Sequence, residues 1–91
     1  MPIQFVRAAP MGHFFFHLRA GEQLILDEEG LDLPDVSAAR HEAVLSAREI
    51  LAAAIRAGKA MMPDAVVISD EAGRALDVVS LVEALPETLK K

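Results

Sequence analysis

Apolar residues recur every three or four positions between residues 35 and 57, which is the spacing of an amphipathic helix. Asp35 is the expected N-cap, because its carboxylate can accept hydrogen bonds from the free amides of the first helical turn. Gly58 follows the last periodic residue, where a left-handed residue often ends a helix. The apolar face consists of Val36, Ala39, Ala43, Val44, Ala47, Ile50, Leu51, Ala54 and Ile55. A helix with such a face is predicted to pack on a sheet.

Alternating apolar residues predict a first strand over residues 13–18 and a second over residues 22–26. Residues 19–21 between them fit a three-residue hairpin loop with Gly21 in the left-handed conformation. This loop places Phe16 opposite Leu24, so the apolar residues of both strands are expected on one face.

A second pair of strands is predicted after the helix. Residues 65–69 form the third strand, and residues 70–74 form a hairpin loop in which Gly73 is left-handed. This loop places Ile68 opposite Leu76. Ser80 and Glu83 have the spacing of a capping box, which predicts a short helix ending near Leu85.

These elements predict an α+β fold of the form ββαββ, with one long helix on one face of a four-stranded antiparallel sheet. The expected strand order is 2-1-3-4, with a right-handed helical crossover. We expect a single domain over residues 13–85, a flexible N-terminal extension over residues 1–12 and a frayed tail over residues 86–91. The predicted sheet core consists of Phe14, Phe16, Leu18, Leu24, Leu26, Val66, Ile68, Leu76 and Val78.

Composition narrows the class of protein. The chain has 91 residues, 53% of them hydrophobic, so a folded domain is expected. A net charge of −5 argues against nucleic acid and anionic membranes as partners. There is no cysteine, hence no disulfide or thiolate metal site. No apolar run approaches the roughly 20 residues of a membrane span, and a cytoplasmic location is expected.

The candidate metal ligands do not have a metal-binding spacing. On one strand, His13 and His17 would lie about 13 Å apart, too far for one ion. His13 is instead expected to face Asp27 across the hairpin. The acidic residues between 27 and 35 lack the ligand spacing of an EF-hand loop. No Ser/His/Asp set, phosphate-binding glycine loop or HExxH motif is present. The sequence therefore predicts no enzyme, no catalytic residue, no cofactor and no metal.

Arg40 is the one charged residue on the apolar face of the helix. A partly buried guanidinium requires a carboxylate, and the acidic residues from Asp27 to Asp32 end the second strand near the start of the helix. The sequence predicts a structural ion pair between Arg40 and Asp27 or a neighbouring acid. The alternative is that Arg40 binds an anionic ligand.

Two acidic turns share one pattern, DEEG at residues 27–30 and DEAG at residues 70–73. Each follows an apolar strand, and common turn chemistry explains them better than an internal repeat.

The ordered motifs of the chain are HFFFHLR at residues 13–19, DEEG at 27–30, LPD at 33–35, AAR at 38–40 and DEAGR at 70–74. They resemble a family of short bacterial proteins defined only as a domain of unknown function, of the DUF6894 type. The resemblance extends over residues 11 to about 85 and implies no established activity. More weakly, a hairpin followed by Leu-Pro-Asp and an alanine-rich helix is similar to HicB-type antitoxins.

A single helix leaves one face of the predicted sheet uncovered. Its apolar centre is expected to consist of Phe15, Ile25, Val67 and Val79, with His13 and His17 beside it. An apolar centre with a polar rim is typical of a protein interface. The first hypothesis is therefore a homodimer formed through this face, or a module that binds another protein. The alternative is an antitoxin-like regulator that binds a toxin or DNA.

Overall fold

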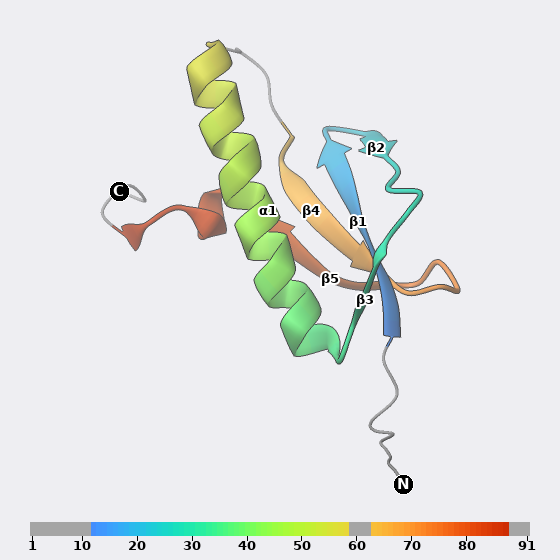
Figure 1. Cartoon of the computed structure of the whole chain (residues 1–91). Coiled ribbons are helices and arrows are strands. Elements are labelled where there is room, and N and C mark those ends of the chain that lie inside the picture. The colour runs from blue at the N-terminus through green and yellow to red at the C-terminus, as the bar shows by residue number, and fades with distance from the viewer. Residues whose placement is uncertain (1–11, 59–62, 88–91) are drawn as a thin grey trace, which may run out of the picture.

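The computed structural model describes residues 12–58 and 63–87, so most of the expected N-terminal extension and the last four residues of the tail lie outside the described residues (Figure 1). The elements follow the order β1 (Gly12–Ala20), β2 (Gln23–Ile25), β3 (Leu31–Leu33), α1 (Val36–Ala57), β4 (Ala65–Ser69), β5 (Ala75–Ser80) and the 3-10 helix η2 (Val82–Ala84). The α+β class is confirmed.

Helix α1 begins and ends where the sequence predicts. Asp35 is the N-cap, and its Oδ1 accepts a hydrogen bond of 2.8 Å from the amide of Ala38. Gly58 has φ 66°, a left-handed conformation that costs a glycine little, and its amide binds the carbonyls of Ala54 and Ile55. Both ends are set by local contacts, which explains why the prediction succeeds.

The sheet is antiparallel, with the order β2-β1-β4-β5. This is the predicted order, but a short extra strand, β3, pairs with the start of β1. The chain reaches β3 through Gly30, which has φ 69°. A Cβ at Gly30 would lie 2.5 Å from Nε2 of His13, so only glycine fits there. The predicted connection between the second strand and the helix is thus partly strand.

The register of the first hairpin differs from the prediction. β1 continues to Ala20, which pairs with Gln23, so the turn has two residues instead of three. Leu18 therefore lies opposite Ile25, and Arg19 opposite Leu24. Since side chains alternate between faces, this change of register exchanges Leu24 and Ile25 between the two faces of the sheet.

A β-bulge changes the second hairpin in a similar way. Ser69 pairs with Ala75 and Ile68 pairs with Asp77, which leaves Leu76 as an extra residue on β5. The predicted pairing of Ile68 with Leu76 is therefore wrong. The bulge turns Val79 into the core and brings Asp77 to the helix-side face of the sheet, the face that carries Phe14, Val66 and Ile68.

The core is smaller than predicted. Its buried residues are Phe14, Ala39, Ala43, Ala47, Val66, Ile68, Val79, Leu81 and Ala84, with Phe16, Leu18, Leu33, Val44, Ile50 and Leu51 packed against them. Four residues of the predicted sheet core are exposed, namely Leu24, Leu26, Leu76 and Val78, and so are Val36 and Ile55 of the predicted apolar helix face. The two altered registers and the position of the helix account for these errors.

The predicted capping box forms at the end of β5. The amide of Ser80 donates to Oε1 of Glu83 at 3.0 Å, and the amide of Glu83 donates to Oγ of Ser80 at 3.2 Å. The turn that follows, η2, packs on α1, where Nε of Arg48 donates to the carbonyl of Ala84 at 2.9 Å. This contact holds the helix over the β5 side of the sheet.

Candidate functional site

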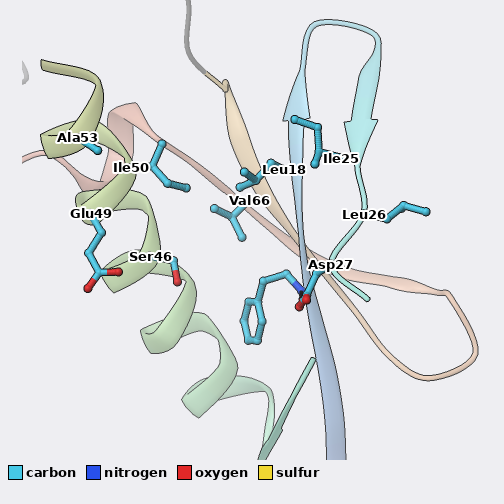
Figure 2. A pocket seen from close by; sticks show the side chains of 10 residues that line it. Leu18, Ile25, Leu26, Asp27, Ser46, Glu49, Ile50, Ala53 and Val66 are labelled. Atoms are coloured by element: carbon cyan, nitrogen blue, oxygen red, sulfur yellow. Dashed lines mark hydrogen bonds between the residues drawn. The ribbon is translucent and has the colours of Figure 1, made fainter. Parts of the chain in front are cut away.

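Helix α1 covers only part of the helix-side face. It packs on β3, β4, β5 and η2, while β2 lies farther from it, on the other side of β4 and β1 (Figure 1). Between the helix and the β1–β2 hairpin is a groove of about 490 Å³. Its lining includes Phe16, Leu18, Ile25, Ile50, Ala53 and Val66 (Figure 2). A groove with this lining is an apolar surface that the fold itself does not close.

The rim of the groove is exposed. Ile25 is 54% exposed and Leu26 is 61% exposed, although both are large apolar side chains. Ile25 lies on the helix side because it pairs with Leu18. Leu26 lies at the boundary, lining both the groove and a second cavity on the other face of the sheet. Adjacent exposed apolar side chains of this size typically mark an interaction surface.

The opposite face of the sheet, here the open face, is the one on which Phe15, His17 and Val67 lie. Its apolar residues differ from those predicted, since Leu24, opposite Arg19, and Val78, opposite Val67, lie there in place of Ile25 and Val79. Phe15 lies between two histidines along β1: its ring makes an edge contact with His13 at 5.0 Å and lies nearly parallel to the ring of His17 at 6.2 Å. Val67 pairs with Val78, which is 39% exposed.

A cavity of about 270 Å³ lies on the open face, between the two acidic turns. We call it the acidic cavity; it is lined by Phe15, His17, Leu26, Asp27, Glu28, Asp70, Glu71 and Gly73. None of these lining residues is a lysine or an arginine. The fold therefore brings the DEEG and DEAG turns to opposite sides of one aromatic strand, a proximity that the sequence pattern alone does not predict.

Asp27 and Asp70, the first residues of these turns, accept hydrogen bonds from backbone amides of the turns. Oδ1 of Asp27 accepts from the amides of Glu29 and Gly30, and Oδ1 of Asp70 accepts from those of Ala72 and Arg74. Burial raises the pKa of Asp27, but the amides of Phe16, Gly30 and Glu29 together outweigh it and lower the pKa. The Arg74 amide is the main cause of the lowered pKa of Asp70. Both carboxylates are thus kept ionised.

The histidines have different partners from those predicted. His13 pairs with Asp32 of β3, at 2.5 Å from Nδ1 to Oδ1, and its Nε2 lies 2.7 Å from the carbonyl of Glu29. The predicted contact of His13 with Asp27 is therefore wrong. His17 binds that residue instead, since the Asp27 amide donates to Nδ1 of His17 at 3.0 Å. Nδ1 of His17 is an acceptor here, so the proton of the neutral ring is on Nε2.

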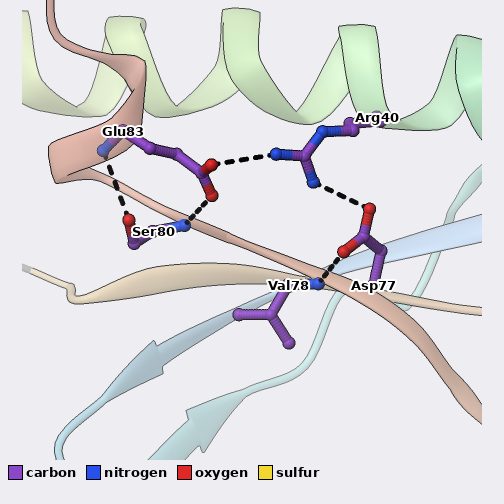
Figure 3. A network of polar contacts seen from close by, with 5 residues as sticks. All are labelled: Arg40, Asp77, Val78, Ser80 and Glu83. Carbon is purple, nitrogen blue, oxygen red and sulfur yellow. Dashed lines mark hydrogen bonds and ion pairs between the residues drawn. The ribbon is translucent and has the colours of Figure 1, made fainter.

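Arg40 forms its ion pairs with β5, the edge strand opposite β2, and with η2. Its Nη1 donates to Oδ2 of Asp77 at 2.7 Å and its Nη2 to Oε2 of Glu83 at 2.9 Å (Figure 3). The predicted pair with Asp27 is wrong because the bulge in β5 turns Asp77 toward the helix. The Arg40 guanidinium is the main cause of the lowered pKa of Asp77. Arg40 links α1, β5 and η2.

The residues predicted as one interface lie in three places. Phe15, Val67 and the two histidines share the open face, as expected. Ile25 lines the groove on the helix side. Val79 is fully buried in the core. The predicted open-face set is therefore wrong for Ile25 and Val79, because each hairpin has a different register from the one assumed.

Two further properties concern the described residues only. They contain no group of three or more histidine, aspartate or glutamate side chains arranged to hold a metal ion. Among their helices, none is long and apolar enough to span a membrane.

A family model for a domain of unknown function, DUF6894, matches residues 13–82. The chain belongs to this family. The match includes the whole of α1 and all of the strands except Gly12, the first residue of β1, so the DUF6894 domain includes both the groove and the open face. No curated protein and no solved structure matches the chain.

The sequence did not indicate the helix side of the groove. Ser46, Glu49 and Ala53 of α1 line it, but nothing in their spacing distinguishes them from residues on a solvent-facing helix surface. One feature of the sequence pointed toward the acidic cavity, namely the similar acidic turns at residues 27–30 and 70–73. The sequence pattern shows that these turns are alike, but it does not show that they lie close together in the fold.

Proposed function

We propose that this DUF6894 domain is a non-enzymatic interaction module that forms a homodimer through the groove. One observation carries the proposal: α1 leaves the β1–β2 side of its own sheet face uncovered, so that Ile25 remains 54% exposed beside an apolar groove. In a single copy this apolar surface faces water. A second copy would bury it, and apolar burial is favourable by about 25 cal/mol per Å².

A two-fold contact requires a surface that is complementary to itself. The groove is the concave part of such a surface, and the β1–β2 hairpin beside it is the convex part, with Ile25 at the end of β2 and Leu26 directly after it. In the proposed dimer, the hairpin of each copy lies in the groove of the other. The same contact is then made twice.

The composition of the core supports this arrangement. The residues of α1 that are buried are all alanines: Ala39, Ala43, Ala47 and Ala54. They bring the helix close to the sheet but bury little apolar area each. A domain of this size gains only modest stability from one core, and oligomerisation is a common means of adding to it.

The test is sedimentation velocity across a range of concentrations. Wild type is expected to be dimeric at tens of micromolar. Ile25→Glu and Ala53→Glu place a carboxylate on the two opposite walls of the groove and are expected to shift the protein to monomer, because a buried unpaired charge is costly. Both residues are exposed in one copy, so the variants should fold.

Ile55→Glu is the matched control. Ile55 is 72% exposed and lies on α1, but it does not line the groove. This variant is expected to remain dimeric. A wild type that is monomeric at tens of micromolar, or an Ile55→Glu variant that dissociates as readily as Ile25→Glu, would overturn the proposal.

A further inference from the structure

The acidic cavity lies on the open face and shares only Leu26 and Asp27 with the groove; Glu28 and Glu71 line the cavity alone. We propose that it is a docking site for an arginine side chain on a basic segment of a protein partner. The inference rests on the aromatic strand in the cavity, on the carboxylates that the fold leaves unused, and on the absence of any lysine or arginine from its lining.

The carboxylates fall into two groups. Asp27 and Asp70 bind backbone amides of their own turns, and Oδ2 of Asp70 also accepts from Nε of Arg74 at 2.9 Å. Glu28 and Glu71 are exposed, and their carboxylates form no hydrogen bond or ion pair with any residue in 12–58 or 63–87, although Glu71 adds a small part to the raised pKa of His13. These two glutamates therefore remain available to a ligand, one on each side of Phe15.

The floor of the cavity favours a flat cation. Phe15 and His17 have nearly parallel rings, with 11° between their planes, and both line the cavity. A guanidinium group stacks on an aromatic face and donates in a fork to carboxylates, whereas an ammonium group makes only point contacts. Nδ1 of His17 accepts from the Asp27 amide, which holds the ring beside Phe15.

Charge also decides between a second copy and another protein. A two-fold contact centred on the acidic cavity would place the same acidic rims against each other, and like charges across an interface are unfavourable. The chain as a whole has a net charge of −5. A basic partner is attracted by both the cavity and the overall field. The volume of about 270 Å³ is suited to one long side chain and not to a whole helix.

Fluorescence anisotropy with the full chain tests this inference. The probe is a labelled short peptide that alternates arginine and glycine, compared with versions in which arginine is replaced by lysine or by neutral citrulline. The arginine peptide is expected to bind at least threefold more tightly than the lysine peptide and about tenfold more tightly than the citrulline peptide. Each tenfold step corresponds to 1.4 kcal/mol.

Variants locate the site. Glu28→Gln and Glu71→Gln are each expected to weaken binding of the arginine peptide about threefold to tenfold, and Phe15→Leu is expected to reduce the preference for arginine over lysine. Glu42→Gln on α1 removes the same charge outside the cavity and is the control. Because Phe15 packs within the sheet, Phe15→Leu could also change the fold. Its result is therefore interpreted together with those of the two glutamate variants, which leave the folded core unchanged.

Equal binding of the arginine and lysine peptides would overturn the inference, since it would indicate only a general acidic surface. So would a Glu42→Gln variant that loses as much affinity as Glu71→Gln. The proposed dimer is measured separately by sedimentation, where Glu28→Gln and Glu71→Gln are expected to match wild type. Failure of one proposal is therefore distinguishable from failure of the other.

Discussion

Arg40 of α1 donates a hydrogen bond of 2.7 Å to Asp77 of β5, joining two residues that are 37 positions apart in the chain. Asp77 is on the edge strand, and the β-bulge before it aims its side chain at the helix. Glu83 of η2 completes the network by accepting from the second terminal nitrogen of Arg40 (Figure 3). This network links α1 to both β5 and η2, two of the elements on which the helix packs.

The first prediction concerns this network. Arg40→Met keeps most of the aliphatic stem but removes the charge, and it is expected to lower the melting temperature modestly, because the Arg40 and Asp77 side chains are 41% and 35% exposed. The effect should shrink at high salt, where exposed ion pairs are screened. Thermal unfolding of Arg40→Met, Asp77→Asn and the double variant measures the coupling. Strictly additive effects of the two single changes would contradict the contact.

A second prediction concerns pH. His13 hydrogen-bonds Asp32 through Nδ1 and the Glu29 carbonyl through Nε2, and both ring nitrogens can donate only in the charged form. The Asp32 carboxylate is the main cause of the raised pKa of His13, followed by the Glu29 carbonyl, and Glu71 adds a smaller effect.

A pKa raised above the ordinary 6.5 in the folded state gives stability that is fully present below pH 6.5 and is lost as the pH rises through the folded-state pKa. The difference in melting temperature between wild type and Asp32→Asn should therefore be largest below pH 6.5 and should decrease in mildly alkaline buffer. Titration of the His13 ring protons by NMR is expected to give a pKa above 6.5. A difference in melting temperature that is the same at every pH would count against this pair.

The third prediction separates the observed register of β5 from the one that simple alternation suggests. Val79 is fully buried, whereas Val78 is 39% exposed. Val79→Ala is expected to reduce the free energy of unfolding by about 2 kcal/mol, through lost apolar burial and the cavity left behind. Val78→Ala, the matched control on the next residue, is expected to change it by about 0.5 kcal/mol or less. Chemical denaturation of both variants measures the difference. The reverse order of effects would indicate that β5 has no bulge.

The acidic cavity and the groove differ in how far the sequence could have located them. The two acidic turns are visible as DEEG and DEAG, and the aromatic strand between them is visible as HFFFH. Their assembly into one cavity depends on β1 pairing with β4, which brings Phe15 opposite Ser69 at the start of the second turn. The groove depends on where α1 lies across the sheet, and no local pattern specifies that position.

What the sequence determined by itself was local. The N-cap of Asp35, the left-handed Gly58, the periodic face of α1 and the capping box of Ser80 and Glu83 all involve contacts within about four residues, so their chemistry is readable from spacing. The order of the four main strands also followed, because short antiparallel connections leave few alternatives.

The tertiary structure determined which side chains lie on each face of the sheet. A turn one residue shorter than expected moved Ile25 to the helix side, and a single extra residue in β5 buried Val79 and aimed Asp77 at Arg40. In a strand the side chains alternate with a period of two, so a shift by an odd number of residues sends every later side chain to the opposite face. Such shifts of register cost little free energy within a single hairpin, and packing across the whole sheet selects among them. For that reason local sequence specifies the helix and strands of this domain, whereas the composition of its surfaces depends on the tertiary structure.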